Sequence, residues 1–441
     1  MATSPRLRLR HAYSYCQAAQ LQARPLGLGR ILSGATGNPT TTTNGVLLPR
    51  VVQQQQQRQH GTTIARGVAE TSIARTDIIT EHPKNNVTDT IFQKLGVNLH
   101  HRKDHPLGII KEAIFQYFEQ KEPGNFKLFD DLYPVVTTKQ NFDELLIPGD
   151  HISRSENDTY YVDSESVLRC HTSAHQAELL REKHKNFLVI GDVYRRDTID
   201  ATHYPVFHQM EGVKIFDPKD WEESGVSAVE YVEEDLKKTL EGLAKHLFGD
   251  VECRWVDAYF PFTDPSIELE IFFNNEWLEV LGCGVMQQKI LDDNYGEGQK
   301  AWAFGLGIER LAMILFDIPD IRLFWSDDER FLKQFKAGDL SSKFKSFSKF
   351  PPCNKDLSFW ISDTFTENNL CEAIRGIAGD IVEEVKLIDE FTNPKKVSFL
   401  HRFSLLSSPP PWKKPLLISL FLKPVACLLF GLGPGKDKPL L

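Results

Sequence analysis

The chain has 441 residues, a formal net charge of −9 and a hydrophobic fraction of 41%. This length predicts two or three folded units, and the ordinary balance of apolar and charged residues excludes a fibre or a membrane channel. Seven cysteines are widely spaced without a Cys-x-x-Cys pair, which argues against a disulfide framework and a structural zinc site.

The first 69 residues differ in composition from the rest of the chain. They contain eight arginines and no lysine, aspartate or glutamate, together with a Thr40–Thr43 run and a Gln53–Gln57 run. An acid-free start that contains arginine and hydroxyl residues is typical of an organelle transit peptide. A merely disordered tail is the alternative, and composition does not distinguish the mitochondrion from the plastid.

The segment 72–345 has the patterns of a folded domain. Apolar residues at helical spacing predict one helix that begins at Pro106 and another that ends before Gly249. Turn signals, rather than regular helices, separate the predicted strands. The pattern therefore predicts an α+β domain around an antiparallel sheet flanked by helices. The strands are expected at Phe187–Ile190, Ile267–Phe273, Glu276–Gly284 and Trp302–Gly305.

A second boundary stands at Pro351-Pro352. Beyond it, Asp356–Ile361 and Val382–Phe391 have strand character, and Asn368–Ala378 has helical spacing. This order predicts a small β-α-β domain over residues 350–396.

The last segment, 397–441, is expected to be a disordered tail. It is rich in proline and contains leucine and phenylalanine clusters without a helical or strand period. Lys423-Pro424 interrupts its apolar stretch, which is also too short to span a bilayer comfortably. We therefore expect no association with a membrane.

The densest cluster of chemically useful residues follows the first predicted strand. Arg195 and Asp197 come after that strand, and a polar loop with Asp200, Thr202 and His203 leads into the next one. Arginine, histidine and acidic groups on such a loop suit a nucleotide phosphate held beside a cationic group. A surface ion pair between Arg195 and Asp197 is the alternative.

The sequence Gly305-Leu306-Gly307-Ile308-Glu309-Arg310 stands between a predicted strand and a predicted helix. A dinucleotide-binding motif needs a third glycine where Arg310 stands, and it needs a parallel β-α-β context. Both are missing from the sequence pattern. An arginine at the start of a helix adds its charge to the positive helix end, which favours a polyphosphate.

Two further blocks are less specific by themselves. His171–Gln176 precedes a leucine-bearing helix, where Thr172 or Ser173 could simply cap that helix. Tyr259–Thr263 contains two phenylalanines around a proline, and such residues most often belong to a core.

Together these segments resemble the single-chain organellar phenylalanine–tRNA ligases, a family of class II aminoacyl-tRNA synthetases. Arg195 and Asp197 match the arginine and acid of the family's motif 2, with aspartate in place of the commoner glutamate. Gly305–Arg310 matches motif 3. The resemblance extends over about residues 72–396. Further matching blocks are Leu132-Tyr133-Pro134 of motif 1, His171–Gln176, Gln209-Met210-Glu211, Phe260-Pro261-Phe262 and Glu279–Gly282.

The resemblance implies ATP-dependent activation of phenylalanine to phenylalanyl-adenylate, followed by transfer to tRNA(Phe) in organellar translation. It implies ATP as a substrate, Mg²⁺ as a cofactor, a monomer, and a mitochondrial or chloroplast location. It also implies a C-terminal ferredoxin-like β-α-β-β-α-β domain that holds the tRNA anticodon stem. Because only its first β-α-β is predicted here, we expect a truncated domain and an impaired tRNA step, with activation retained.

The resemblance further implies a role for each matching residue on the ATP side. Arg195 would hold the α-phosphate and Arg310 the γ-phosphate, and these two are the expected catalytic residues. Phe207 would stack on adenine, Asp197 would lie near its amino group, and Glu279 would bind Mg²⁺ or nucleotide. The motif 2 loop that faces ATP would include Thr202, His203 and Tyr204.

On the amino-acid side, the resemblance implies a polar site for the ammonium group and an aromatic pocket for the side chain. The ammonium would be bound by Ser173, Gln209 and Glu211, with His171 and Gln176 nearby. The same matching blocks place Ala174, His175 and Met210 at this site. The expected pocket residues are Phe260, Phe262, Ala303 and Phe304.

Two other functions stay open at this point. One is a non-catalytic RNA-binding or regulatory protein on a synthetase scaffold, which the intact Arg195, Arg310 and Glu211 disfavour. The other is an enzyme that ligates an amino acid to something other than tRNA. Phe260 and Phe262 favour phenylalanine as that amino acid.

Overall fold

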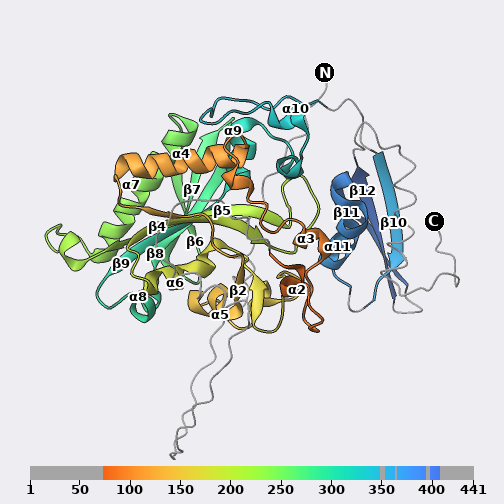
Figure 1. Ribbon diagram of the computed structural model, residues 1–441, viewed down its shortest axis with the longest axis horizontal. Helices are drawn as coiled ribbons and strands as arrows, with labels where there is room; N and C mark the ends of the chain where they lie inside the picture. Colours follow the sequence, from red (N-terminus) through yellow and green to blue (C-terminus); the bar gives the residue numbers. More distant parts are fainter. Residues whose placement is uncertain (1–72, 348–352, 363–364, 394–397, 408–441) are drawn as a thin grey trace, which may run out of the picture. The chain divides into compact units, whose positions relative to one another are not determined.

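The structure of the protein is a computed structural model that describes residues 73–347, 353–362, 365–393 and 398–407. The predicted transit peptide, and the predicted tail beyond residue 407, lie outside these ranges. Figure 1 shows a larger α+β domain followed along the chain by a small domain that contains β10, β11, β12 and α11. Among the described helices, none combines the length and apolar character needed to cross a membrane.

Seven strands form the central sheet of the larger domain, in the order β1-β4-β5-β9-β8-β7-β6. Neighbouring strands are antiparallel except β1 and β4, which run parallel. The predicted α+β domain around an antiparallel sheet is confirmed. The strands are β1 (Lys127–Phe129), β4 (Asn186–Tyr194), β5 (Val206–Phe216), β6 (Glu252–Ala258), β7 (Thr263–Phe273), β8 (Glu276–Met286) and β9 (Lys300–Gly307). A separate pair consists of β2 (Val135–Thr137) and β3 (Ser166–Leu168).

Helices pack on both faces of this sheet. Figure 1 shows α4 and α7 together on one face, with α6 and α8 on the other. Pro106 occupies the first turn of α4, and Gly249 ends α7 with a positive φ of 81°, as the sequence predicted. The helices are α2 (Arg75–Ile78), α3 (Asp89–Phe92), α4 (Pro106–Lys121), α5 (Thr138–Asn141), α6 (Gln176–Arg181), α7 (Ala228–Phe248), α8 (Gln288–Asn294), α9 (Ile308–Phe316), α10 (Glu329–Leu332) and α11 (Glu367–Ala378).

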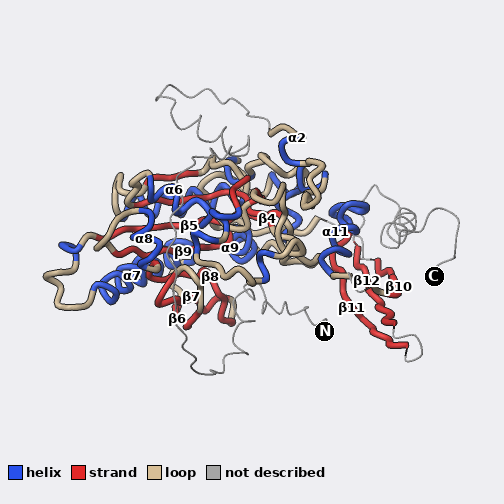
Figure 2. Tube along the Cα trace, turned by 90° about the horizontal axis from the view of Figure 1, so that it is seen from below, coloured by secondary structure: helices blue, strands red, loops and turns tan. Residues whose placement is uncertain are grey.

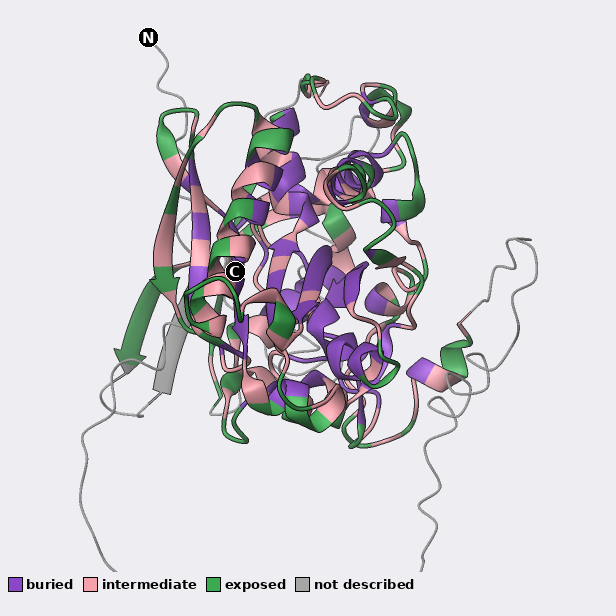
Figure 3. Ribbon diagram, turned by 90° about the vertical axis from the view of Figure 1, so that its left-hand side faces the viewer, coloured by how far each residue is buried: buried purple, intermediate pink, exposed green. Residues whose placement is uncertain are grey.

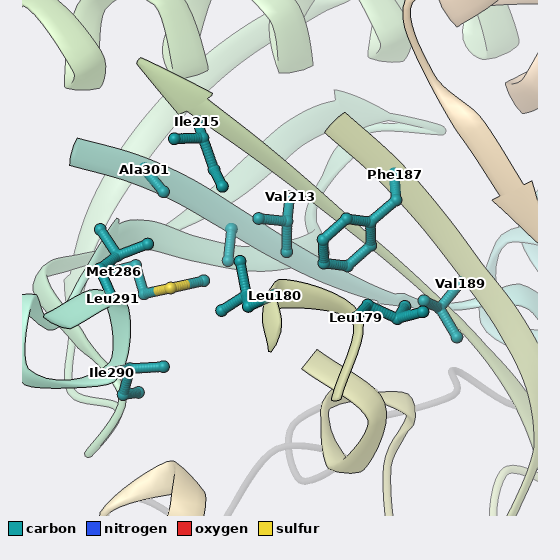
Figure 4. Close-up of a cluster of buried hydrophobic side chains, with 11 residues drawn as sticks. Leu179, Leu180, Phe187, Val189, Val213, Ile215, Met286, Ile290, Leu291 and Ala301 are labelled. Atoms are coloured by element: carbon teal, nitrogen blue, oxygen red, sulfur yellow. The ribbon is translucent and has the colours of Figure 1, made fainter. Parts of the chain in front are cut away.

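A hydrophobic cluster fills the space between the sheet and the helices α6 and α8. Figure 4 shows strand residues such as Val213 and Ala301 directed toward the leucine and isoleucine side chains of these helices. The central strands are the most deeply buried part of the domain (Figure 3). This cluster fixes one end of a sheet face whose other end carries polar side chains. Its members are Leu179, Leu180, Phe187, Val189, Val213, Ile215, Met286, Ile290, Leu291, Ala301 and Ala303.

The small domain corrects one of our expectations. Residues 398–407, which we assigned to a disordered tail, form β12 (Ser398–Ser407) and lie between β10 (Cys353–Trp360) and β11 (Val382–Asn393). Both pairings are antiparallel, and Figure 2 shows the three strands side by side. The small domain therefore continues beyond residue 396 and has a β-α-β-β order in its described part.

The physical reason is a short alternation that the surrounding sequence hides. Phe403 and Leu405 are buried against α11, while Arg402 between β10 and β11 is exposed. This period of two is the pattern of a strand with one covered face. The alternation covers only a few residues, and the proline and leucine clusters farther along the chain have no strand period. The segment 397–441 taken as a whole therefore does not show it.

Candidate active site

One face of the central sheet carries most of the expected site residues. Side chains along a strand alternate between faces, and residues paired across neighbouring antiparallel strands share a face. Phe207, Gln209 and Glu211 therefore lie in a row on β5, on the same face as Val213 of the hydrophobic cluster. Gly305 of β9 pairs with Glu211 and belongs to this face as well.

Arg195 follows β4 and is fixed at the Phe207 end of this row. Its Nε donates a hydrogen bond of 2.8 Å to the carbonyl oxygen of Cys170, and its guanidinium lies 5.1 Å from the centre of the Phe207 ring. Strand pairing brings Val193, two residues before Arg195, opposite Phe207. The expected phosphate-binding arginine and adenine-stacking ring are thus brought together.

The loop after Arg195 is organised around Asp200. Its carboxylate accepts hydrogen bonds from the backbone N–H groups of Thr202 and His203, at 2.7 and 2.9 Å, and lies 2.6 Å from His203 Nδ1. Burial disfavours the ionised carboxyl, but the hydrogen bonds from His203 and Thr202 outweigh it and lower the pKa of Asp200 to about 2. Asp197 accepts a hydrogen bond of 2.8 Å from the N–H of Thr198.

Arg310 lies in the first turn of α9, as the motif predicted. Its Nη1 is 3.6 Å from Glu279 Oε2 on β8. Within the described residues, the buried Nε and Nη1 atoms of Arg310 and Oε1 of Glu279 have no hydrogen-bond partner. Burial raises the pKa of Glu279, although the charge of Arg310 opposes that shift. Buried polar atoms without partners indicate a place for a polar ligand.

A buried contact joins the two arginine-bearing segments. Glu309 accepts a 2.7 Å hydrogen bond from the backbone N–H of His208, and its other oxygen is 2.7 Å from His208 Nδ1. Since His208 follows Phe207 and Glu309 precedes Arg310, this contact fixes the end of β5 against α9. Arg195 follows β4, which pairs with β5, so strand pairing and this contact together link the segments that carry Arg195 and Arg310, as a shared triphosphate requires.

The polar end of the amino-acid site is deeply buried. Burial raises the pKa of Glu211 to about 8, because it outweighs the hydrogen bonds from Ser173 and Thr172 that favour the ionised form. Gln209 Oε1, Gln176 Nε2 and both ring nitrogens of His171 lack partners in the described part of the chain. Such a set of orphaned polar groups suits an ammonium and carboxylate brought by a ligand.

Two phenylalanines and two glycines shape the same face beside Glu211. The rings of Phe260 and Phe262 stack 5.8 Å apart at an interplanar angle of 13°. A Cβ atom on Gly282 would lie 2.6 Å from the Phe260 ring, and one on Gly305 would lie 2.9 Å from Gln209 Nε2. A side chain at Gly282 would press on the Phe260 ring, and one at Gly305 would displace the end of the Gln209 side chain. With glycine at both positions, the sheet surface between the aromatic and polar groups carries no side chain there.

Five expected site residues lie elsewhere. Met210 and Phe304 project from the opposite face of the sheet, since they alternate with Glu211 and Ala303. Phe304 stacks on Phe118 of α4, with ring centres 5.8 Å apart, and belongs to the core. The other three are occupied by separate packing contacts: Ala174 with Val136 and Val167, His175 with Arg169, and Tyr204 with Asp380.

The sequence patterns did not indicate two groups close to this site. Asn141 is fully buried, and its Oδ1 accepts the backbone N–H of Cys170, whose carbonyl holds Arg195. The spacing Thr137-x-x-Gln140 predicts the start of α5, but no pattern predicts the contact at Cys170. The alternation of Ile267, Leu269 and Ile271 with charged residues predicts that Glu268 lies on the solvent face of its strand. Burial and the nearby Glu279 and Glu270 instead raise its pKa to about 7.

Comparison with known proteins gives consistent results. Residues 90–335 match the family described as tRNA synthetases class II core domain (F), and residues 348–408 match the ferredoxin-fold anticodon binding domain. The chain is 63% identical to the Arabidopsis thaliana protein named chloroplastic/mitochondrial phenylalanine–tRNA ligase, over 79% of this chain and 82% of that one.

Two mitochondrial phenylalanine–tRNA ligases are similarly related. The protein of Mus musculus is 52% identical over 70% of this chain and 76% of its own length. That of Dictyostelium discoideum is 48% identical over 73% of this chain and 82% of its own length. The chain therefore belongs to the organellar phenylalanine–tRNA ligase family of class II aminoacyl-tRNA synthetases.

Proposed function

We propose that this chain activates phenylalanine with ATP and transfers the aminoacyl group to tRNA(Phe) in mitochondria, chloroplasts or both. The observation that carries the proposal is the order of groups along one sheet face. Arg195 and Phe207 lie at one end, Gln209 and Glu211 follow, and the stacked phenylalanines lie beside them. The relatives, named as phenylalanine–tRNA ligases, support the same substrates.

In the first step, an oxygen of the phenylalanine carboxylate forms a bond to the α-phosphorus of ATP. The bond from that phosphorus to the bridging oxygen breaks, and pyrophosphate leaves with the electron pair. The carboxylate is already ionised, so no general base is needed. Arg195 and Arg310 act by holding the triphosphate in line and by stabilising charge on its oxygens.

Glu279 fits the role of a magnesium ligand. Mg²⁺ commonly takes one or two protein carboxylates together with the phosphates of its substrate. Glu279 has a buried oxygen without a partner in the described residues. The half-buried Glu268 lies close to it, and burial together with the charge of Glu279 raises the pKa of Glu268. Bound there, the ion would neutralise charge on the phosphates of ATP.

For the second step, we propose transfer to tRNA(Phe) at reduced efficiency and by a monomer. The described small domain contains three strands and one helix, whereas the resemblance implies four strands and two helices. In the described sheet, β10 pairs with β12 along one edge only, so the other edge lacks the fourth strand. With fewer elements, the part of the small domain that the structure describes has less surface to hold the anticodon stem.

The proposal is tested by ATP–pyrophosphate exchange with a panel of amino acids, followed by aminoacylation of tRNA(Phe). We expect exchange with phenylalanine, and we expect charging to be weaker than in a relative with the complete domain. A protein without amino-acid-dependent exchange would instead be a binding protein on a synthetase scaffold. ATP–pyrophosphate exchange without any aminoacylation of tRNA(Phe) would indicate that the activated amino acid is transferred to another acceptor. Light scattering during size-exclusion chromatography measures the mass and tests the monomer.

A further inference from the structure

The loop that follows Arg195 is fastened to the small domain along its backbone. Four consecutive carbonyl oxygens accept hydrogen bonds from α11 and β11. The Arg196 carbonyl accepts from Asn368 Nδ2 at 3.1 Å, and the Ile199 carbonyl from the N–H of Val385 at 2.9 Å. The carbonyls of Asp197 and Thr198, between them, both accept from Nη2 of Arg375.

Arg375 is held rigidly while it makes these contacts. It is 5% exposed, and its Nη1 lies 3.2 Å from Glu372 Oε2. That carboxylate also accepts hydrogen bonds from Tyr160 and Thr88 of the larger domain, at 2.8 and 2.9 Å. A buried guanidinium with partners on both sides is a pre-organised support and not a mobile surface cation.

An apolar contact secures the same loop. Ile199 is 5% exposed and packs into the core of the small domain, with Leu370 and Phe403. Asn368 additionally donates to the carbonyl of Asn157, at 2.9 Å. The backbone of residues 196–199 is therefore fixed by side chains and one backbone N–H group of the domain expected to bind tRNA.

The side chains of this loop are the ones expected to bind ATP. Arg195 immediately precedes the fastened segment, and Asp197 within it is the residue expected at the adenine amino group. Asp200, which organises Thr202 and His203, follows directly. A displacement of these carbonyls would shift the ATP-binding side chains, and misplacement by about 1 Å is sufficient to cost reaction rate.

We infer that Arg375 and Asn368 are positioning residues for ATP in amino-acid activation, so that the small domain organises the ATP-binding loop as well as serving tRNA. The inference rests on the proposed function. Arg375 and Asn368 do not touch substrate in this arrangement. They act through the carbonyls of residues 196–198.

The test compares variants of the full chain by phenylalanine-dependent ATP–pyrophosphate exchange. Arg375→Gln removes the double contact to Asp197 and Thr198, and we expect the KM for ATP to rise roughly tenfold. The KM for phenylalanine should stay within about twofold, because Arg375 supports the ATP loop and not the aromatic pocket. Arg375→Lys keeps one charged donor and should recover part of the effect. Asn368→Ala should shift the same constant less.

Arg402→Gln is the matched control, since Arg402 pairs with Asp356 on the same small sheet and is exposed. It should leave both KM values unchanged. A purely structural role for Arg375 would reduce the folded fraction and lower kcat with both KM values unaltered, and this result would overturn the inference. Equal changes in both KM values would overturn it too. No exchange by the wild-type chain would contradict the proposed function itself, and the inference would fall with it.

Discussion

Glu211 combines burial, an unusual pKa and a place in the row of site residues. With a pKa of about 8, its carboxyl is mostly protonated at neutral pH in the substrate-free protein. An ammonium group bound against it favours the ionised form. If phenylalanine binds with its ammonium group against Glu211, as we propose, binding releases a proton and the affinity depends on pH.

We expect phenylalanine binding to release close to one proton at pH 7 and to tighten from pH 6 to pH 8, by up to about tenfold per unit. The sign follows from the raised pKa of about 8, because the free carboxyl is mostly protonated at pH 6 and 7 and still about half protonated at pH 8, whereas the carboxyl bound to an ammonium group is ionised. Calorimetry in buffers of different ionisation enthalpy measures the proton. Glu211→Gln should abolish the release.

A second carboxyl supplies the control for this experiment. Glu268 also has a pKa raised to about 7, by burial and by Glu279 and Glu270. If Glu211 is the source, Glu268→Gln retains proton release on phenylalanine binding. Loss of the release in Glu268→Gln, and its persistence in Glu211→Gln, would show that the source was assigned to the wrong residue.

Gly212 tests the packing on the opposite face of the sheet. A Cβ atom there would lie 2.2 Å from Phe304, whose ring is stacked on Phe118 and cannot move away freely. We expect Gly212→Ala to lower the free energy of unfolding by about 1–3 kcal/mol. Gly149→Ala, where nothing lies within 4 Å, should be near neutral. Equal midpoints of chemical denaturation for the two variants would argue against this packing.

At the scale of elements, the contact between β5 and α9 decides how the ATP site is assembled. Glu309 is 2% exposed and satisfies two donors of His208 at once. An exposed ion pair, such as that between Lys289 and Asp293 on α8, has water as an alternative partner.

Glu309→Ala should lower the free energy of unfolding by about 3 kcal/mol, because it leaves buried donors of His208 unsatisfied. Glu309→Gln keeps one acceptor oxygen and should cost less. The control Asp293→Ala on the surface should change stability by less than about 1 kcal/mol. Urea denaturation measures the free energy of unfolding of all three variants. A loss for Glu309→Ala as small as that for Asp293→Ala would contradict the buried contact between Glu309 and His208.

On the scale of the whole molecule, the two domains share contacts at the ATP-binding loop. The core of the small domain contains Phe403 and Leu405 of β12 together with Ile199 of the larger domain. The integrity of this sheet therefore bears on activation as well as on tRNA.

A chain that ends after Lys396 lacks β12, the central strand of the small sheet, whereas a chain that ends after Ser407 keeps it. We expect the shorter chain to lose hydrogen-exchange protection in α11 and to require roughly tenfold more ATP for half-maximal exchange activity. The longer chain should match the full chain in both measurements. Identical behaviour of the two truncated chains would show that β12 contributes nothing to the loop.

Much of this arrangement follows from local pattern in the sequence. Helical spacing after Pro106 and before Gly249, and alternation in Ile267–Phe273, predict α4, α7 and β7 because each element buries one face. The motif residues Arg195 and Arg310 were placed correctly at the end of a strand and at the start of a helix. These features depend on residues only a few positions apart, so the local sequence is sufficient to predict them.

Tertiary structure alone decided which of the motif residues meet. Met210 stands within a matching block and Phe304 is an expected pocket residue next to one, but both face the core, since the sheet presents only alternate residues to the site. The placing of β12 depended on partners far earlier in the chain, in β10, and the support of the ATP loop by Arg375 joins positions 178 and 177 residues apart. Such contacts are set by the packing of whole elements, which leaves no periodic trace in the chain.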